Sequence, residues 1–183
     1  MVSPQEITQT TQIEISPLQE SDIAQLVPIL HEHVRDSDTH LVQEGEITDI
    51  VSWMRGQPDE ANNHRIRSYF VARDINGQVL GCIGITKAAT YHLIHHQTIA
   101  ADTAELVNFF VTSTVQGRGV GRKLFNQVLA EARNHGKKYL VLDSGPRYEH
   151  SWPIYDKLFG NSGTTIQNLY GPGYHARTWK IDL

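Results

Sequence analysis

Residues 104–135 read AELVNFFVTSTVQGRGVGRKLFNQVLAEARNH, and this stretch decides the fold. Its first part, residues 104–112, is a nearly unbroken apolar run rich in strand-forming side chains, which predicts a buried strand. Its last part, residues 119–135, repeats apolar residues at helical spacing, for example Leu124 and Val128, which predicts an amphipathic helix. The stretch therefore predicts a strand, a short loop and a helix in immediate succession.

The loop between strand and helix has glycine at positions 117, 119 and 121. Without Cβ atoms the backbone can turn sharply and present its N–H groups to an anion, and the helix N-terminus adds partial positive charge. Arg118 and Arg122 bring further positive charge to the same place. The pattern predicts a phosphate-binding loop, and a tight turn without a ligand is the alternative that the spacing leaves open.

Two other phosphate-binding motifs fit this loop poorly. A dinucleotide fingerprint G-x-G-x-x-G would need glycine at position 122 or 124, which hold Arg122 and Leu124. A P-loop would need Gly-Lys-Ser/Thr at the start of the helix, where the chain has Gly121-Arg122-Lys123. A nucleotide-binding regulatory domain is therefore disfavoured.

The length and composition are typical of a globular domain. The sequence has 183 residues, a formal net charge of −4 and 39% hydrophobic residues, which gives no broad basic surface for nucleic acid and no apolar run of membrane-spanning length. The one cysteine, Cys82 in the run VLGCIGI, is predicted to be a buried core residue. We expect a cytoplasmic protein with neither nucleic acid nor a membrane as partner, with residues 1–11 as a flexible tail and residues 12–183 as a single domain.

The remaining elements follow from periodicity and turn residues. Strands are predicted at 12–16, 67–74, 78–87, 139–142, 164–170 and 177–183, and helices at 23–35, 43–55 and 151–158. Ser21 or Asp22 is the expected N-cap of the first helix, and Asn76-Gly77 predicts a hairpin. Residues 56–66 read as a polar loop.

Residues 88–103 are weakly patterned, so a hairpin extension and a loop insertion both stay open. The segment holds His92, His95 and His96, without a carboxylate or cysteine at a familiar metal-ligand spacing. We expect these histidines to lie on the surface or in an acceptor-binding loop, and we expect no metal.

The stretch 104–135 resembles motif A of the GCN5-related N-acetyltransferase (GNAT) superfamily, whose loop pattern is Gln/Arg-x-x-Gly-x-Gly/Ala. Gln116, Gly119 and Gly121 fill its fixed positions, and the flanking elements and their order along the chain are also similar. The resemblance implies an α/β (α+β mixed) fold. Its centre would be a twisted, mixed and mostly antiparallel sheet of six or seven strands with splayed central strands, flanked by about four helices.

The same resemblance implies acetyl-CoA as co-substrate. The loop amides would hold the pyrophosphate, and the end of the preceding strand would pair with the pantetheine arm. The residues implied in coenzyme binding are Phe109, Phe110, Val111, Gln116, Gly117, Arg118, Gly119, Val120, Gly121 and Arg122.

Two residues are implied in catalysis. Glu105 stands eleven residues before Gln116, where the histone-acetylating members carry a glutamate base, although a solvent-facing or salt-bridged carboxylate is an equal alternative. Tyr155 matches the family's tyrosine that donates a proton or a hydrogen bond to the coenzyme sulfur. The alternative is a tyrosine packed on the sheet. Tyr148 and Ser151 depart from the Asn and Ala that the family often has, so the Asn contact to the coenzyme is not carried over.

The resemblance therefore implies an N-acetyltransferase that moves the acetyl group from acetyl-CoA directly to a primary amine of a small molecule or a peptide. A non-catalytic acetyl-CoA sensor or scaffold is the alternative, and a homodimer stays open. We expect acceptor contacts from residues 56–66 and 90–103, and Asn108 is a further candidate for orienting the acceptor. Four acidic residues of the helical region either face a cationic amine or form a solvated surface: Asp36, Asp38, Glu44 and Glu46.

Overall fold

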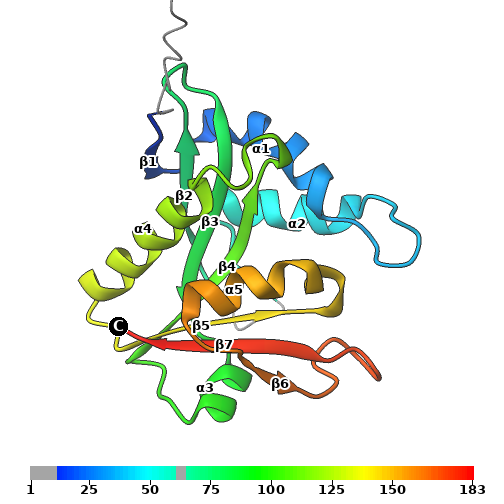
Figure 1. The fold of residues 1–183 in the computed structure, drawn as a ribbon, viewed down its shortest axis with the longest axis vertical. Helices are drawn as coiled ribbons and strands as arrows, with labels where there is room; N and C mark the ends of the chain where they lie inside the picture. Colours follow the sequence, from blue (N-terminus) through cyan, green and yellow to red (C-terminus); the bar gives the residue numbers. More distant parts are fainter. Residues whose placement is uncertain (1–11, 61–64) are drawn as a thin grey trace, which may run out of the picture.

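The structure, a computed structural model, describes residues 12–60 and 65–183 (Figure 1). Its centre is one seven-stranded sheet with the strand order β1-β2-β3-β4-β5-β7-β6. The strands are β1 (Glu14–Pro17), β2 (Ser68–Arg73), β3 (Val79–Lys87), β4 (Thr103–Val111), β5 (Tyr139–Ser144), β6 (Thr164–Ile166) and β7 (Ala176–Asp182). Every neighbouring pair is antiparallel except β4 and β5, which run parallel. The mixed, mostly antiparallel sheet predicted from the sequence is confirmed.

Five α-helices flank the sheet where about four were expected. They are α1 (Glu20–His33), α2 (Glu44–Met54), α3 (Thr90–His96), α4 (Val120–Asn134) and α5 (Trp152–Phe159), with short 3₁₀ turns η2 (Ser113–Val115) and η3 (Pro146–Ser151). The additional helix, α3, lies in the weakly patterned segment. None of the helices in the described residues has the length and apolar composition needed to cross a membrane. The tail predicted for residues 1–11 lies outside the described part of the chain.

Two apolar layers hold the helices against opposite faces of the sheet. Residues of α4 and α5, such as Leu124 and Phe159, pack with Leu106, Leu140 and Trp179 from β4, β5 and β7. Residues of α1 and α2 pack on the other face, over alternate residues of β2 and β3 that include the fully buried Cys82. Because successive strand residues point to opposite faces, β2, β3 and β4 each contribute to both layers. The predicted burial of Cys82 is confirmed.

Two predicted boundaries move, and the predicted hairpin forms. Helix α1 begins earlier than expected, with Gln19 as its N-cap, because the Asp22 carboxylate accepts the Gln19 N–H at 2.7 Å from the third helical position. The predicted hairpin forms, with the turn Asp74–Gln78 between β2 and β3. The strand predicted at 164–170 is only three residues long, and Asn168 beyond it has a left-handed φ of 55°.

Candidate active site

Strand β4 has a β-bulge in the part that lines the site. Cys82 pairs with Phe110 and Gly84 with Val107, so one residue of β3 faces two of β4, and Asn108 has a left-handed φ of 48°. The Asn108 Oδ1 accepts hydrogen bonds from the Tyr69 hydroxyl at 2.8 Å and from Arg67 Nη1 at 3.0 Å. The side chain that the sequence offered as an acceptor-orienting group therefore holds the bulge.

Strands β4 and β5 separate in the middle of the sheet. They pair only from Thr103↔Tyr139 to Glu105↔Val141, although β4 continues to Val111 and β5 to Ser144. The edge of β4 that faces β5 therefore has no partner strand over residues 106–111. The predicted splay is confirmed, and its apex lies at Glu105.

The glycine loop follows the open end of β4. Gly117 and Gly119 have left-handed φ values of 79° and 84°, and Gly119 is the N-cap of α4. The N–H groups of the first helical turn have no partner within the helix, and no acidic side chain occupies that turn. A Cβ on Gly117 or Gly119 would meet nothing within 4 Å, so the space in front of the backbone is open. This geometry suits a bound anion.

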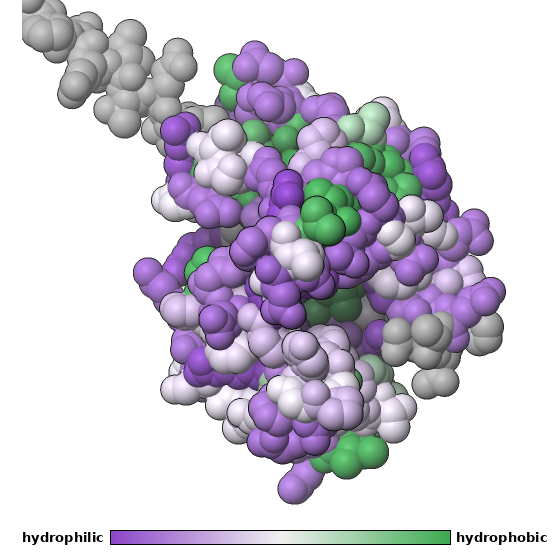
Figure 2. Space-filling model, turned by 90° about the vertical axis from the view of Figure 1, so that its right-hand side faces the viewer, coloured by the Kyte–Doolittle hydropathy of each residue, from purple (hydrophilic) through white to green (hydrophobic). Residues whose placement is uncertain are grey.

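The gap and the loop open into one cleft of about 1090 Å³. Figure 2 looks onto the side where the surface is hollowed between the upper and lower halves of the molecule, with apolar atoms deep in the hollow. Ten of the residues predicted for the site line the cleft: Glu105, Phe109, Phe110, Val111, Gln116, Gly117, Gly119, Gly121, Arg122 and Tyr155. The Val120 side chain is buried in the core instead, and Arg118 is exposed beside the loop.

The end of α1 holds the start of the loop, a contact that no sequence pattern indicated. One oxygen of the Glu32 carboxylate accepts the Thr112 hydroxyl at 2.9 Å and the other accepts the Ser113 N–H at 2.8 Å. Burial alone would raise the pKa of Glu32, but these hydrogen bonds together lower it. His33 Nε2 and the Gln116 amide both lie within hydrogen-bond distance of the Val111 carbonyl oxygen, at 2.9 Å and 3.3 Å. Helix α1 therefore fixes the junction of β4 and the loop.

Glu105 is 3% exposed, yet it lines the cleft. Its Oε2 accepts a hydrogen bond from Arg65 Nη1 at 2.5 Å and another from the Ala89 N–H at 2.7 Å. Burial raises the pKa of Glu105, and the nearby His92 and Arg65 oppose that rise. The carboxyl group is therefore held in place, salt-bridged, and easier to protonate than an ordinary glutamate.

The expectation that the three histidines lie on the surface or in a loop was wrong for His92, whereas His95 and His96 are half-buried. All three histidines lie on α3, and His92 is fully buried. Polar side chains of the sheet beneath this helix provide hydrogen-bond partners for the buried ring. His92 Nε2 lies 2.9 Å from Asp143 Oδ1, and His96 Nε2 lies 2.9 Å from the Thr178 hydroxyl. Burial lowers the pKa of His96 to about 4, which keeps it uncharged near neutral pH.

Asp143 is a second cleft-lining carboxylate that the sequence analysis missed, because the predicted strand ended one residue before it. It accepts hydrogen bonds from the hydroxyls of Tyr91, at 2.8 Å, and Tyr170, as well as contacting His92. Burial would raise the pKa of Asp143, but the hydrogen bonds from His92, Tyr170 and Tyr91 together lower it.

The same cluster contains the atoms that could hold a metal ion. One ligand atom each from His92, Glu105 and Asp143 lies within 4.8 Å of the others. Arg65 already contacts the Glu105 carboxylate, however, and its guanidinium charge disfavours a doubly charged metal ion coordinated by the same carboxylate. The arrangement is that of a hydrogen-bonded network.

Tyr155 approaches the gap from the opposite face of the sheet. Its ring lies between Phe109 of β4, at 6.4 Å between ring centroids, and Trp179 of β7, at 5.2 Å. Asp156 fixes the helix by accepting the Trp179 indole N–H at 2.8 Å. Burial raises the pKa of Tyr155, so the phenol stays protonated at any physiological pH. Pro153 lies in the first turn of α5.

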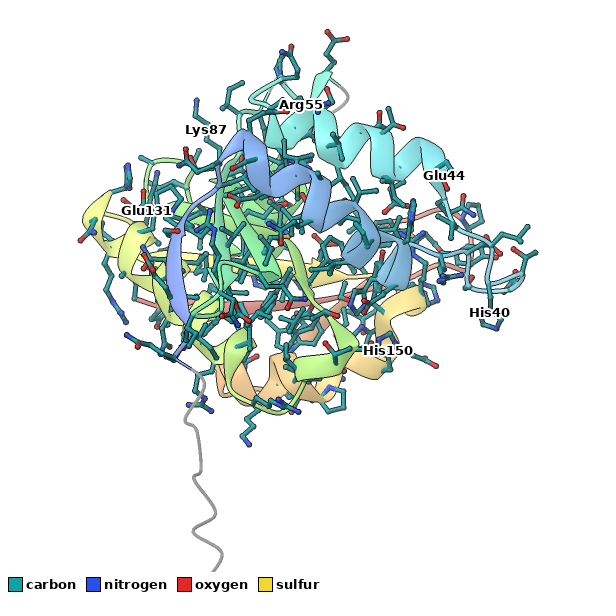
Figure 3. All side chains as sticks on the ribbon, turned by 90° about the horizontal axis from the view of Figure 1, so that it is seen from above. His40, Glu44, Arg55, Lys87, Glu131 and His150 are labelled. Carbon is teal, nitrogen blue, oxygen red and sulfur yellow. The ribbon has the colours of Figure 1, made fainter. Side chains whose placement is uncertain are left out.

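The outer part of the cleft is polar and aromatic. Asp36 and Glu46 line it, whereas Asp38 and Glu44 do not, and Arg147 forms an ion pair with Glu46 at 2.8 Å. Figure 3 shows His150 of η3 on the same side of the molecule as His40 of the α1–α2 connection.

The described parts of the polar segment 56–66, which leave out residues 61–64, contribute buried charge from Asp59 and Arg65. Arg67 ion-pairs with Asp59, and its guanidinium lies over the Trp53 ring at 3.5 Å. Asp59, Arg65 and Arg67 are each at least nine-tenths buried, because they neutralise one another and Glu105 beneath the cleft.

Comparisons with known proteins agree with this architecture. The family model described as "Acetyltransferase (GNAT) family" matches residues 27–160, which is more than half of the chain. A search of curated proteins finds no significant match.

Solved structures share the fold at low sequence identity. An N-acetyltransferase from Staphylococcus aureus Mu50 matches at 19% identity with a TM-score of 0.65, covering 94% of this chain and 99% of that one. An acetyltransferase from Streptococcus agalactiae 2603 matches at 21% identity and 0.64, covering 96% and 99%. An aminoglycoside 6'-N-acetyltransferase complexed with coenzyme A matches at 16% identity and 0.64, covering 92% and 96%. Splayed strands, a glycine loop at a helix N-terminus and the match of the family model lead to one conclusion: the chain belongs to the GNAT family of acetyltransferases.

Proposed function

We propose that the protein transfers the acetyl group of acetyl-CoA to a primary amine by direct attack in a ternary complex. The observation that carries this proposal is the opening between β4 and β5 beyond Glu105, which leads directly to the glycine loop at the start of α4. One cleft thus joins an anion site to a channel lined by unpaired strand edge.

The chain's own backbone fits the coenzyme. The N–H groups of residues 120–122 and the Arg122 side chain would bind the pyrophosphate, because they concentrate positive charge at the helix end. The free edge of β4 up to Val111 would pair with the amide groups of the pantetheine arm as an added strand does. When bound there, acetyl-CoA supplies a thioester carbonyl for an uncharged amine to attack.

Glu105 is the proposed base on the acceptor side. An alkyl ammonium near pKa 10 is mostly protonated at neutral pH and attacks only after it loses a proton. Glu105 lies at the apex of the gap, and its raised pKa makes it a better proton acceptor than an exposed carboxylate. Arg65 holds the carboxylate in one orientation.

Tyr155 is the proposed acid on the other face. Glu105 points to the face that carries α3, whereas Tyr155 packs in the α4–α5 layer, so the two groups reach the gap from opposite sides. A phenol that stays protonated can donate a hydrogen bond or a proton to the departing thiolate. The geometry thus separates proton removal from proton delivery.

Calorimetry and a thiol assay test the proposal. Acetyl-CoA should bind, nicotinamide dinucleotides and ATP should not, and a panel of primary amines should release free CoA thiol in an amine-dependent way. Tight acetyl-CoA binding without turnover over the whole panel would support a sensor or scaffold instead. Absence of acetyl-CoA binding would overturn both.

The role of Glu105 has its own test. Glu105→Gln should lower activity most at pH values between the raised pKa of Glu105 and the pKa of the amine, where the carboxylate is ionised and the amine is still mostly protonated. Thermal unfolding of the variant shows whether its loss of the Arg65 ion pair affects the fold. A pH profile parallel to that of the wild type would make Glu105 a structural carboxylate.

A further inference from the structure

Two carboxylates face each other where the central strands separate. Glu105 belongs to the last β4–β5 pair, and Asp143 lies two residues beyond its partner Val141, so both point to the sheet face that carries α3. Both line the cleft, and ligand atoms of the two carboxylates lie within 4.8 Å of each other. One small cationic group therefore fits between them.

The two carboxylates differ in how their charge is compensated. Glu105 is ion-paired with Arg65, and Glu46 in the outer cleft is ion-paired with Arg147. Asp143 has no arginine or lysine partner among the described residues, and it is held by His92 and by the hydroxyls of Tyr91 and Tyr170. Its negative charge is therefore available to a cation that enters the cleft.

We propose that Asp143 is the anchor for the ammonium group of the acceptor amine, and that His92 positions its carboxylate. This inference rests on the proposed acetyl transfer and extends it to a second residue. An ammonium forms hydrogen bonds of about 2.8 Å to carboxylate oxygens, so one nitrogen can bridge two oxygens up to roughly 5.6 Å apart. An ammonium bound to Asp143 thus presents a proton to Glu105.

The environments of the two groups support this division of roles. The pKa of Asp143 is lowered by its hydrogen-bond donors and that of Glu105 is raised by burial, so one stays ionised while the other accepts protons more readily. The titratable and charged groups around the pair come from several elements. They are Arg65 before β2, Tyr91, His92 and His96 on α3, and Tyr170 between β6 and β7.

His92 is a positioning residue because it is fully buried behind Asp143 and cannot touch the acceptor itself. Its other ring nitrogen lies 3.3 Å from the Thr178 hydroxyl, which fixes the ring plane between β5 and β7. His92→Gln keeps a donor near the position of Nε2, whereas His92→Phe keeps the ring shape and loses the donor. The Gln variant should therefore retain more amine affinity than the Phe variant.

Binding of butylammonium tests the anchor without acetyl-CoA. In wild-type protein with ¹³C-labelled aspartate, titration with butylammonium at fixed ionic strength should shift the carboxyl signal of Asp143. Asp143→Asn should weaken butylammonium binding by about tenfold or more, as loss of a charge-assisted hydrogen bond implies. Asp49→Asn, which changes an exposed carboxylate of α2 outside the cleft lining, should leave the affinity unchanged.

Kinetics give the second readout. With butylamine as acceptor, Asp143→Asn and His92→Phe should raise the amine KM far more than they change kcat or the KM for acetyl-CoA. Because both side chains are buried, thermal unfolding checks each variant, and the wild-type titration needs no variant at all. An unshifted Asp143 signal at saturating butylammonium would overturn the anchor.

The outcomes for the two proposals are distinguishable. Butylammonium binding at Asp143 without any acetyl transfer would overturn the proposed reaction and keep the anchor. Acetyl transfer with an unchanged amine KM in a folded Asp143→Asn variant would overturn the anchor alone. If Zn²⁺ shifted the Asp143 signal and butylammonium did not, the cluster would be a metal centre and the anchor would be wrong.

Discussion

Glu32→Gln perturbs the contact by which α1 holds the coenzyme loop. The substitution keeps the shape of the side chain but removes its charge, and an amide can accept only one of the two hydrogen bonds that Thr112 and Ser113 donate. Because Thr112 directly follows β4 and Ser113 begins the η2 turn into the glycine loop, the variant loosens the backbone that leads to Gln116.

The size of the effect follows from the two hydrogen bonds. A hydrogen bond to a charged group contributes about 1.5–3 kcal/mol, but the Glu32 side chain is 33% exposed, so water replaces part of the loss. We expect a decrease of about 1 kcal/mol in the free energy of unfolding, which lowers Tm by about 2–4 °C in a domain of this size. If coenzyme binding must restore the same order, the KM for acetyl-CoA rises by up to about fivefold.

Calorimetric unfolding and acetyl-CoA titration measure both quantities, with Glu20→Gln as a control. Glu20 is an exposed carboxylate of α1 that pairs with Arg55 away from the loop. The folded-state pKa of Glu32 is lowered below its ordinary value of 4.5, so its contribution is present above pH 4.5 and is lost as the pH falls through the folded-state pKa. The difference between wild type and Glu32→Gln should therefore vanish in acid. Equal Tm and equal acetyl-CoA affinity at neutral pH would refute the role of this contact.

Three further substitutions and labels test separate parts of the account. Tyr155→Phe should slow turnover by about 100-fold, which is the lower end for loss of a general acid because a thiolate leaves easily. Acetyl-CoA affinity in calorimetry should stay the same. Turnover at the full wild-type rate would exclude the acid role of Tyr155. Gly119→Ala should weaken acetyl-CoA binding by about fivefold, since a left-handed φ of 84° costs an alanine roughly 1 kcal/mol. Gly45→Ala in α2, where an added Cβ meets no atom within 4 Å, should leave acetyl-CoA binding unchanged. Equal affinities of the two variants would contradict phosphate binding by the glycine loop. Burial raises the pKa of Cys82 to about 12, so a disulfide reagent should label it only after unfolding, and rapid labelling of the native protein would contradict its burial.

The strands and helices with strong periodicity could be predicted from the sequence, because their side chains alone specify which face is buried. The helix from Val120 to Asn134 and the strand from Thr103 to Val111 lie within one residue of their predicted bounds. The GNAT resemblance then placed these elements in a splayed sheet, since the glycine loop has a fixed position between them.

The acceptor side could not be predicted, because its contacts join residues far apart in the chain. The burial of His92 depends on Asp143 and Thr178, 51 and 86 positions away, and nothing near His92 in the sequence indicates them. Asp143 itself follows the apolar run YLVL and reads as the start of a turn. Continuing the alternation of β5 by one step would have placed it on the same face as Val141, and hence beside Glu105.

The most direct measurement of the central claim is an amide chemical-shift titration of ¹⁵N-labelled protein with acetyl-CoA. The account predicts saturable shifts that concentrate in the loop residues 117–122 and along β4 from Val107 to Val111, where the strand edge is unpaired. Saturable binding that shifts other amides and leaves both segments unchanged would contradict the placement of the coenzyme between β4 and β5.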